Sequence, residues 1–187
     1  MGSKNGLNAV IIVFVIFVVF ILYNSGRSKK YKMIYKEFDL VENFDKAKIT
    51  GRRPKTDNAW HCTLARIEID GKPCIFSHPD SSLSYMITLP KDRKFVFKSS
   101  VGFHPVAKKW IISDGVRMSV KIINGSGSKI IFNRYVMPKD NLFNVEIPLD
   151  DYAGKNIILS LYSLNDKGKN AKGDWAVWFE PKIIREQ

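Results

Sequence analysis

The chain has 187 residues, a length that suits one domain with an added segment. It is 45% hydrophobic and 26% charged, which excludes an intrinsically disordered chain, and its two cysteines are too few for a disulfide-rich scaffold or a four-cysteine zinc site. Lysine and arginine number 30 against 18 aspartate and glutamate residues, so the formal net charge is +12.

An apolar run is the first feature along the chain. Residues 9–23 (AVIIVFVIFVVFILY) contain no strongly polar side chain, and the run can be extended back to Leu7. A helix over residues 7–23 would rise about 25 Å, at the short end of a bilayer span. An uncleaved membrane anchor and a cleaved signal peptide both stay open. We favour the anchor, because Ser25 and Gly26 offer only a weak cleavage site.

A basic segment follows the apolar run. Residues 1–36 contain six basic side chains and no acidic one. Such a cluster beside a span favours anionic lipid headgroups over nucleic acid, so no specific nucleic-acid partner is expected. We therefore divide the chain into a short tail, a transmembrane helix or signal anchor, a basic linker and a β-sandwich domain. Their bounds are 1–6, 7–23, 24–37 and 38–187.

From about Phe38 onward the hydrophobic period is two, which is typical of half-buried strands. Val116 to Ile122 shows the alternation most clearly. Further strands are predicted at Cys62–Ile69, Cys74–His78, Leu83–Leu89, Lys94–Lys98, Lys129–Tyr135, Phe143–Ile147, Asn156–Tyr162 and Trp175–Ile184. Turn residues separate these segments. The predicted fold class is all-β: an antiparallel β-sandwich of the jelly-roll type, preceded by one N-terminal transmembrane helix.

The Asp70-Gly71 pair predicts a tight hairpin. Both central residues of a type I′ turn need positive φ, and paired residue numbers would then sum to 141. Pro73 would block a neighbour on its outer side, so we expect its strand at a sheet edge. In this register Cys74 would face Ile67. Cys62 would lie five residues further along the strand, roughly 16 Å from Ile67 and on the opposite face, which argues against a disulfide between the two cysteines.

Catalytic motifs are absent from the sequence. It contains no G-x-S-x-G elbow, no H-E-x-x-H pair and no Walker-type loop. The three histidines, His61, His78 and His104, each suit a loop or a strand end better than a catalytic base. We therefore expect a protein that is not an enzyme.

Three stretches carry a resemblance to a known family. They are Ile75–Pro79 with Leu83–Tyr85, Val101–Pro105 with Trp110 and Ser113–Val116, and Gly173–Ile183. In this order they resemble a galactose-binding-like jelly-roll domain, similar to the carbohydrate-binding modules found beside glycosidases. The likeness extends over roughly residues 60–184, about two thirds of the chain.

The resemblance implies binding of a glycan or another envelope component through loops at one end of the sandwich. We assign ligand contacts to Trp110, Trp178, His104 and Asp114. Trp110 lies in an expected loop, and Trp178 faces the side of its strand opposite to Trp175, which we expect in the core. Core packing stays open for both Trp175 and Trp178, and a plain turn stays open for Asp114.

Such modules often hold structural calcium, by the same resemblance. Asp174, with backbone carbonyl groups of residues 165–173, is the candidate ligand, although no dense acidic cluster surrounds it. The resemblance also places the domain outside the cytoplasm, against the charge bias. We expect a single-pass membrane protein whose extracytoplasmic domain binds a glycan or envelope polymer and touches anionic lipid headgroups. The alternative is a membrane-anchored protein-interaction module that binds no sugar.

Overall fold

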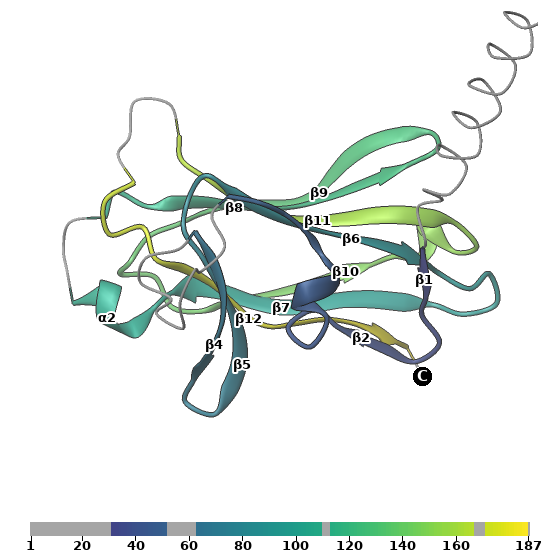
Figure 1. Ribbon diagram of the computed structural model, residues 1–187, viewed down its shortest axis with the longest axis horizontal. Coiled ribbons are helices and arrows are strands. Elements are labelled where there is room, and N and C mark those ends of the chain that lie inside the picture. The colour runs from purple at the N-terminus through teal and green to yellow at the C-terminus, as the bar shows by residue number, and fades with distance from the viewer. Residues whose placement is uncertain (1–30, 52–62, 110–112, 167–170, 187) are drawn as a thin grey trace, which may run out of the picture. The chain divides into compact units, whose positions relative to one another are not determined.

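The computed structural model describes residues 31–51, 63–109, 113–166 and 171–186, and most of them lie in two stacked sheets (Figure 1). The first sheet contains, in spatial order, β1 (Lys32–Met33), β6 (Ser81–Thr88), β11 (Asn156–Leu164), β8 (Val116–Asn124) and β9 (Gly127–Val136), with β3 (Lys48–Thr50) also on β6. The second contains β10 (Phe143–Pro148), β7 (Phe95–Phe103), β12 (Ala176–Arg185), β5 (Lys72–Ser77) and β4 (Leu64–Ile69), with β2 (Glu37–Asp39) also on β12.

Among the strand pairs that the structure describes, β1 and β6 run parallel and the others run antiparallel. Short helices fill some connections: α2 (Pro105–Lys108) and two 3₁₀ turns, η1 (Phe44–Lys46) and η3 (Asp150–Tyr152). The predicted all-β sandwich is therefore confirmed. The predicted transmembrane helix lies outside the described residues, and none of the helices within them is long and apolar enough to cross a bilayer.

The Asp70-Gly71 hairpin has the predicted register. Asp70 and Gly71 have φ values of 52° and 75°, and Cys74 pairs with Ile67. The expectation that Pro73 marks an edge strand is wrong, because β5 lies between β4 and β12. Pairing with β12 ends at Cys74, so no ladder bond is required of Pro73 and the proline is tolerated inside the sheet.

The folded unit begins earlier than the predicted boundary at residue 38. It starts at Tyr31, and β1 adds to the edge of the first sheet within the segment assigned to the linker. Ile34 follows β1 and is buried in the main core. Strands of two or three residues are too short to show a hydrophobic period, which is why the sequence did not reveal β1, β2 and β3.

The main core fills the space between the two sheets. Its largest buried side chains include Trp178, Tyr85 and Phe97. A second, smaller cluster lies on the outer face of the second sheet, where Cys74 packs with Val177 and Phe179. Cys74 is a free thiol, and burial raises its pKa to about 11; Cys62 lies outside the described residues.

Candidate functional site

The topology gathers several connections at one end of the sandwich. These are the segment between β7 and β8, which contains α2, the end of β9, and the segment between β11 and β12. Figure 1 shows α2 at this end, away from β1 and the C-terminus. We call it the loop end and define it by residues 104–109, 113–115, 135–137, 165–166 and 171–175.

His104 joins α2 to β12. Its Nδ1 accepts a hydrogen bond from the Val106 N–H at 3.2 Å, so it caps the first turn of α2. Its own backbone N–H donates to the Trp175 carbonyl oxygen at 2.8 Å, and the two rings meet edge to face with centroids 6.1 Å apart. Burial lowers the pKa of His104, which keeps the imidazole neutral and able to accept the capping bond. The sequence placed His104 correctly at a strand end but did not reveal its capping role.

Asp174 links the segment between β11 and β12 to the segment between β7 and β8. The Asp174 carboxylate is buried, and the Ser113 hydroxyl donates a hydrogen bond to it. The Gly115 N–H in turn donates to the Ser113 hydroxyl at 3.1 Å. Gly115 has φ of 100°, and a Cβ there would lie 2.6 Å from the Met137 Sδ, so a larger residue would push this chain of bonds apart.

The calcium prediction concerns the same carboxylate. Among the described residues, no group of three His, Cys, Asp or Glu side chains is arranged to hold a metal ion. Residues 167–170, part of the loop expected to supply carbonyl ligands, lie outside the described residues. Calcium at Asp174 therefore stays a prediction, and Ser113 is one hydrogen-bond partner of this carboxylate.

An ion pair that the sequence analysis missed stands beside Asp114. Arg117 donates to both carboxylate oxygens of Asp166 at 2.8 Å, and this bonding raises the pKa of Arg117. The Arg117 guanidinium lies 5.8 Å from the centroid of the Tyr135 ring. The Tyr135 hydroxyl donates to the backbone oxygen of Asp114, so the end of β9 is tied to the segment that precedes β8. No local signal links Arg117 to Asp166, because only the fold brings these distant positions together.

The two tryptophans near the start of β12 differ in their burial. Trp178 is 1% exposed and lies in the main core, with its ring 6.4 Å from that of Phe132, so the expectation that it is available to a ligand is wrong. Trp175 precedes β12 at the loop end and is partly exposed. β12 turns Trp178 toward the first sheet, whereas Trp175 packs edge to face against Phe76 and also touches the main core. Trp110 lies outside the described residues.

No family model matches the chain. An uncharacterized protein of Archaeoglobus fulgidus is 30% identical over 131 residues, which cover 64% of this chain and 32% of that protein. The chain thus spans about a third of the length of this curated relative.

Several solved structures share the fold. CBM51 from Clostridium perfringens GH95, in complex with methyl-galactose, is 17% identical with a TM-score of 0.50, covering 79% of this chain and 99% of its own. TmCBM61, in complex with β-1,4-galactotriose, is 13% identical with a TM-score of 0.52; the match covers 79% of this chain and 94% of TmCBM61. CBM51-2 from Clostridium perfringens ZmpB, in complex with GlcNAc, is 16% identical with a TM-score of 0.52; the match covers 80% of this chain and 31% of that one. The chain therefore shares the jelly-roll β-sandwich fold of these modules, as the sequence resemblance indicated.

Proposed function

We propose that this chain is a membrane-anchored, non-catalytic glycan-binding module that recognises a glycan or envelope polymer through its loop end. The observation that carries the proposal is the grouping there of two partly exposed aromatic side chains, Tyr135 and Trp175, with the Arg117–Asp166 pair. Aromatic faces stack on the apolar face of a pyranose, and a planar ion pair offers donors and acceptors to sugar hydroxyl groups.

The shared fold supports this choice without naming the ligand. The similar modules were solved with methyl-galactose, GlcNAc and β-1,4-galactotriose, and glycan binding is carried over from them as part of the proposal. Their role as non-catalytic domains agrees with the lack of a catalytic motif in the sequence.

Membrane anchoring rests on the sequence. The apolar run at residues 7–23 supports a single span, and the basic residues after it would meet anionic lipid headgroups. An envelope glycan would be met outside the cytoplasm, so the domain is proposed to be extracytoplasmic.

A glycan array probed with the full chain tests the function. The protein is held in a zwitterionic detergent that carries no sugar, so that the detergent does not compete. We expect selective signals on a family of related glycans, and Trp175→Ala is expected to weaken them. Glycan binding is contradicted if the protein retains its β-rich circular dichroism spectrum but shows no saturable binding on the array.

Protease added to spheroplasts tests the location of the domain. An extracytoplasmic domain is digested without permeabilisation of the membrane.

A protein-interaction module is the second candidate function. Large apolar side chains are exposed on or beside β9 and β10, each an edge strand of its sheet: Ile130 is 57% exposed, Leu142 45% and Phe143 37%. Exposed apolar groups near a free strand edge suit a partner protein. This function predicts that Phe143→Asp abolishes co-purification of a partner while Trp175→Ala does not.

A further inference from the structure

Two lysine side chains converge on one amide oxygen at the edge of the first sheet. The Lys32 Nζ donates to the Asn43 Oδ1 at 3.0 Å, and the Lys46 Nζ donates to the same oxygen at 2.9 Å. Lys32 lies in the edge strand β1 (Figure 1), and Lys46 is the last residue of η1. Two positive charges are therefore held beside one neutral acceptor.

Asn43 is held in place by the fold. Its side chain is buried, and its amide nitrogen donates to the Asp39 carbonyl oxygen at 2.6 Å. The backbone N–H of Asn43 donates to the same carbonyl oxygen at 3.2 Å. Because both bonds fix the amide group, its oxygen is a set point at which the two ammonium groups meet before any ligand arrives, which lowers the cost of ordering them on binding.

Lys32 has a second contact, with an aromatic ring. Its Nζ lies 5.0 Å from the centroid of the Phe38 ring, and Phe38 belongs to the main core. Burial lowers the pKa of Lys32, and the charge of Lys46 lowers it further. The two cations thus repel each other, and an anion that bridges them would replace this repulsion by attraction.

Each ammonium group of the pair keeps free donors. An ammonium group has three N–H donors, and one from each lysine is directed at Asn43. Among the described residues, none of the ion pairs includes Lys32 or Lys46. The donors that remain are therefore available to an oxyanion.

The acidic side chains of the same loop, residues 39–47, are mostly engaged elsewhere. The Asp39 Oδ1 accepts from the backbone N–H groups of Val41 and Glu42 at 2.7 and 3.0 Å. Asp45 pairs with Arg66 at 3.5 Å. The carboxylate of Glu42 is exposed, and its charge raises the pKa of Lys32, so Glu42 is the acidic side chain of this loop that competes with an incoming anion.

We propose that Lys32 and Lys46 form a phosphate-binding site at the edge of the first sheet. The two ammonium groups can each donate to a different oxygen of one phosphate group, and such charge-assisted bonds are stronger than bonds to a neutral amide. Lysine binds phosphate as a point charge, whereas the planar fork of arginine is the better match for a carboxylate. A neutral sugar gains nothing from two cations, so this site is separate from glycan recognition at the loop end.

The phosphate belongs either to a lipid headgroup or to a free phosphate ester. The position of Lys32 favours the headgroup, because it follows the end of the apolar run at residue 23 by nine residues, which span at most about 30 Å. This source rests on the membrane anchor of the proposed function, whereas phosphate binding itself does not depend on the anchor.

The test follows the Asn43 side-chain amide by NMR in full-length, ¹⁵N-asparagine-labelled protein in an amine-oxide detergent, which contains no phosphate; Asn43→Ser identifies the signal. Inorganic phosphate is added at constant ionic strength, and acetate is the comparison anion. We expect phosphate to shift the signal saturably, and acetate not to. Lys46→Gln should weaken phosphate binding about ten-fold, because a charge-assisted bond is lost. Glu42→Gln should strengthen it about two-fold, because a competing charge is removed.

The matched control is Lys129→Gln. It also removes one exposed lysine charge from an edge strand of the first sheet, but from β9 at the opposite edge, and should leave the phosphate affinity unchanged. The proposal is overturned if phosphate does not shift the Asn43 signal, if acetate shifts it equally, or if Lys129→Gln weakens binding as much as Lys46→Gln.

Small bicelles separate the two sources of the phosphate group. Bicelles that contain phosphatidylglycerol should shift the Asn43 signal without added phosphate, bicelles of phosphatidylcholine alone should not, and Lys46→Gln should abolish the shift. A response to inorganic phosphate without a response to phosphatidylglycerol supports the site and overturns the headgroup as its source. Glycan-array binding should be unchanged in Lys46→Gln, so failure of the glycan proposal and failure of the phosphate site are measured separately.

Discussion

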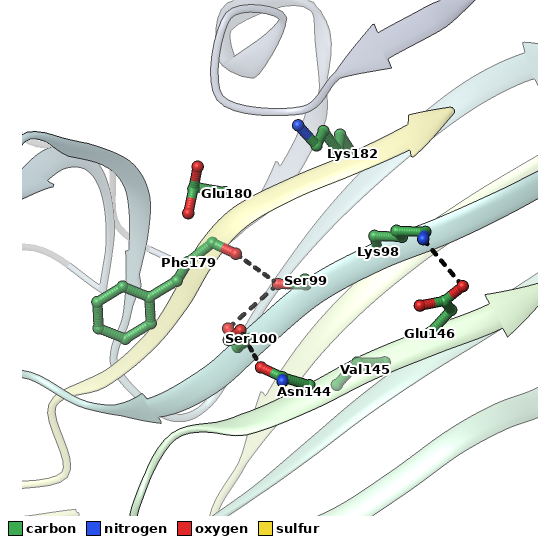
Figure 2. Close-up of a pocket in the computed structure, with 9 residues that line it drawn as sticks. All are labelled: Lys98, Ser99, Ser100, Asn144, Val145, Glu146, Phe179, Glu180 and Lys182. Atoms are coloured by element: carbon green, nitrogen blue, oxygen red, sulfur yellow. Dashed lines mark hydrogen bonds and ion pairs between the residues drawn. The ribbon is translucent and has the colours of Figure 1, made fainter. Parts of the chain in front are cut away.

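Two regions of the molecule carry polar side chains that are held in different ways: the loop end, and a shallow hollow on the second sheet that residues of β7, β10 and β12 line (Figure 2). At the loop end Asp174 is buried and accepts from Ser113, while His104 caps α2. In the hollow, the Lys98 and Glu146 side chains pair at 2.9 Å while they remain 38% and 60% exposed. We therefore expect the polar bonds of the loop end to contribute more to the free energy of unfolding than those of the hollow.

The largest expected effect is the loss of stability when one of the two tryptophans near the start of β12 is replaced by alanine. Trp178→Ala should lower the free energy of unfolding by about 3–5 kcal/mol, because a large buried side chain leaves a cavity. Trp175→Ala should cost less stability and should weaken glycan binding, because Trp175 is partly exposed at the loop end. Urea unfolding compares the two. A larger stability loss for Trp175→Ala would reverse the assignment.

Asp174 tests whether the loop end depends on its buried bond. Asp174→Ala should lower the free energy of unfolding by about 1.5–3 kcal/mol, since it removes a charged acceptor and leaves the Ser113 hydroxyl without it. Asp174→Asn retains an acceptor and should cost less. Thermal melts of both variants measure the difference in stability. Equal losses of stability for Asp174→Ala and Asp174→Asn would show that the retained side-chain oxygen does not stabilise the loop end.

Calcium is a separate question at the same position. The predicted ion would stabilise the folded state that binds it, so chelation with EGTA should lower the Tm of the wild type and leave Asp174→Asn unchanged. A wild-type Tm that does not respond to EGTA or to added calcium would contradict calcium binding at Asp174.

His104 gives the loop end a dependence on pH. Its pKa is lowered by burial, so above the ordinary value of about 6.5 its contribution to stability is complete. As the pH falls from there toward the lowered pKa, the unfolded chain binds the proton more readily, and stability declines. His104→Asn keeps a capping acceptor without titrating and should show a flatter profile. Urea unfolding at pH 7.5 and pH 5 measures how the free energy of unfolding changes with pH in the wild type and in His104→Asn. The same change in both proteins would exclude His104 as the source of the pH dependence.

The smallest effect is expected in the hollow. Glu146→Gln should change the free energy of unfolding by less than about 1 kcal/mol, because the Lys98–Glu146 pair is exposed. The same urea titrations measure it. A loss as large as that of Asp174→Ala would mean that the hollow, like the loop end, is held by its polar side chains.

Local patterns in the sequence predicted much of the sandwich. Alternation marked most of the strands from Leu64 onward, and Asp70-Gly71 set the hairpin register, since a two-residue turn fixes which residues face each other. The pattern lost β7 after Lys98, because Ser99, Ser100 and Gly102 interrupt the apolar alternation while the strand continues to Phe103.

The candidate sites were less predictable than the strands. Sequence reasoning named His104, Asp114 and Asp174, which the structure brings to one end, but it could not show that each already makes structural hydrogen bonds. It did not find the lysine pair at Asn43, because Lys32 lies on a two-residue strand whose position only the fold sets.

By itself, the sequence determined the all-β class and the hairpin register, because these follow from contacts between neighbours in the chain. Only the tertiary structure decided which face of β12 meets the first sheet, that Arg117 meets Asp166, and that β10, β7 and β12 line the hollow. Period-two alternation tells that a strand has two faces, but the side that meets the other sheet depends on pairing between distant segments.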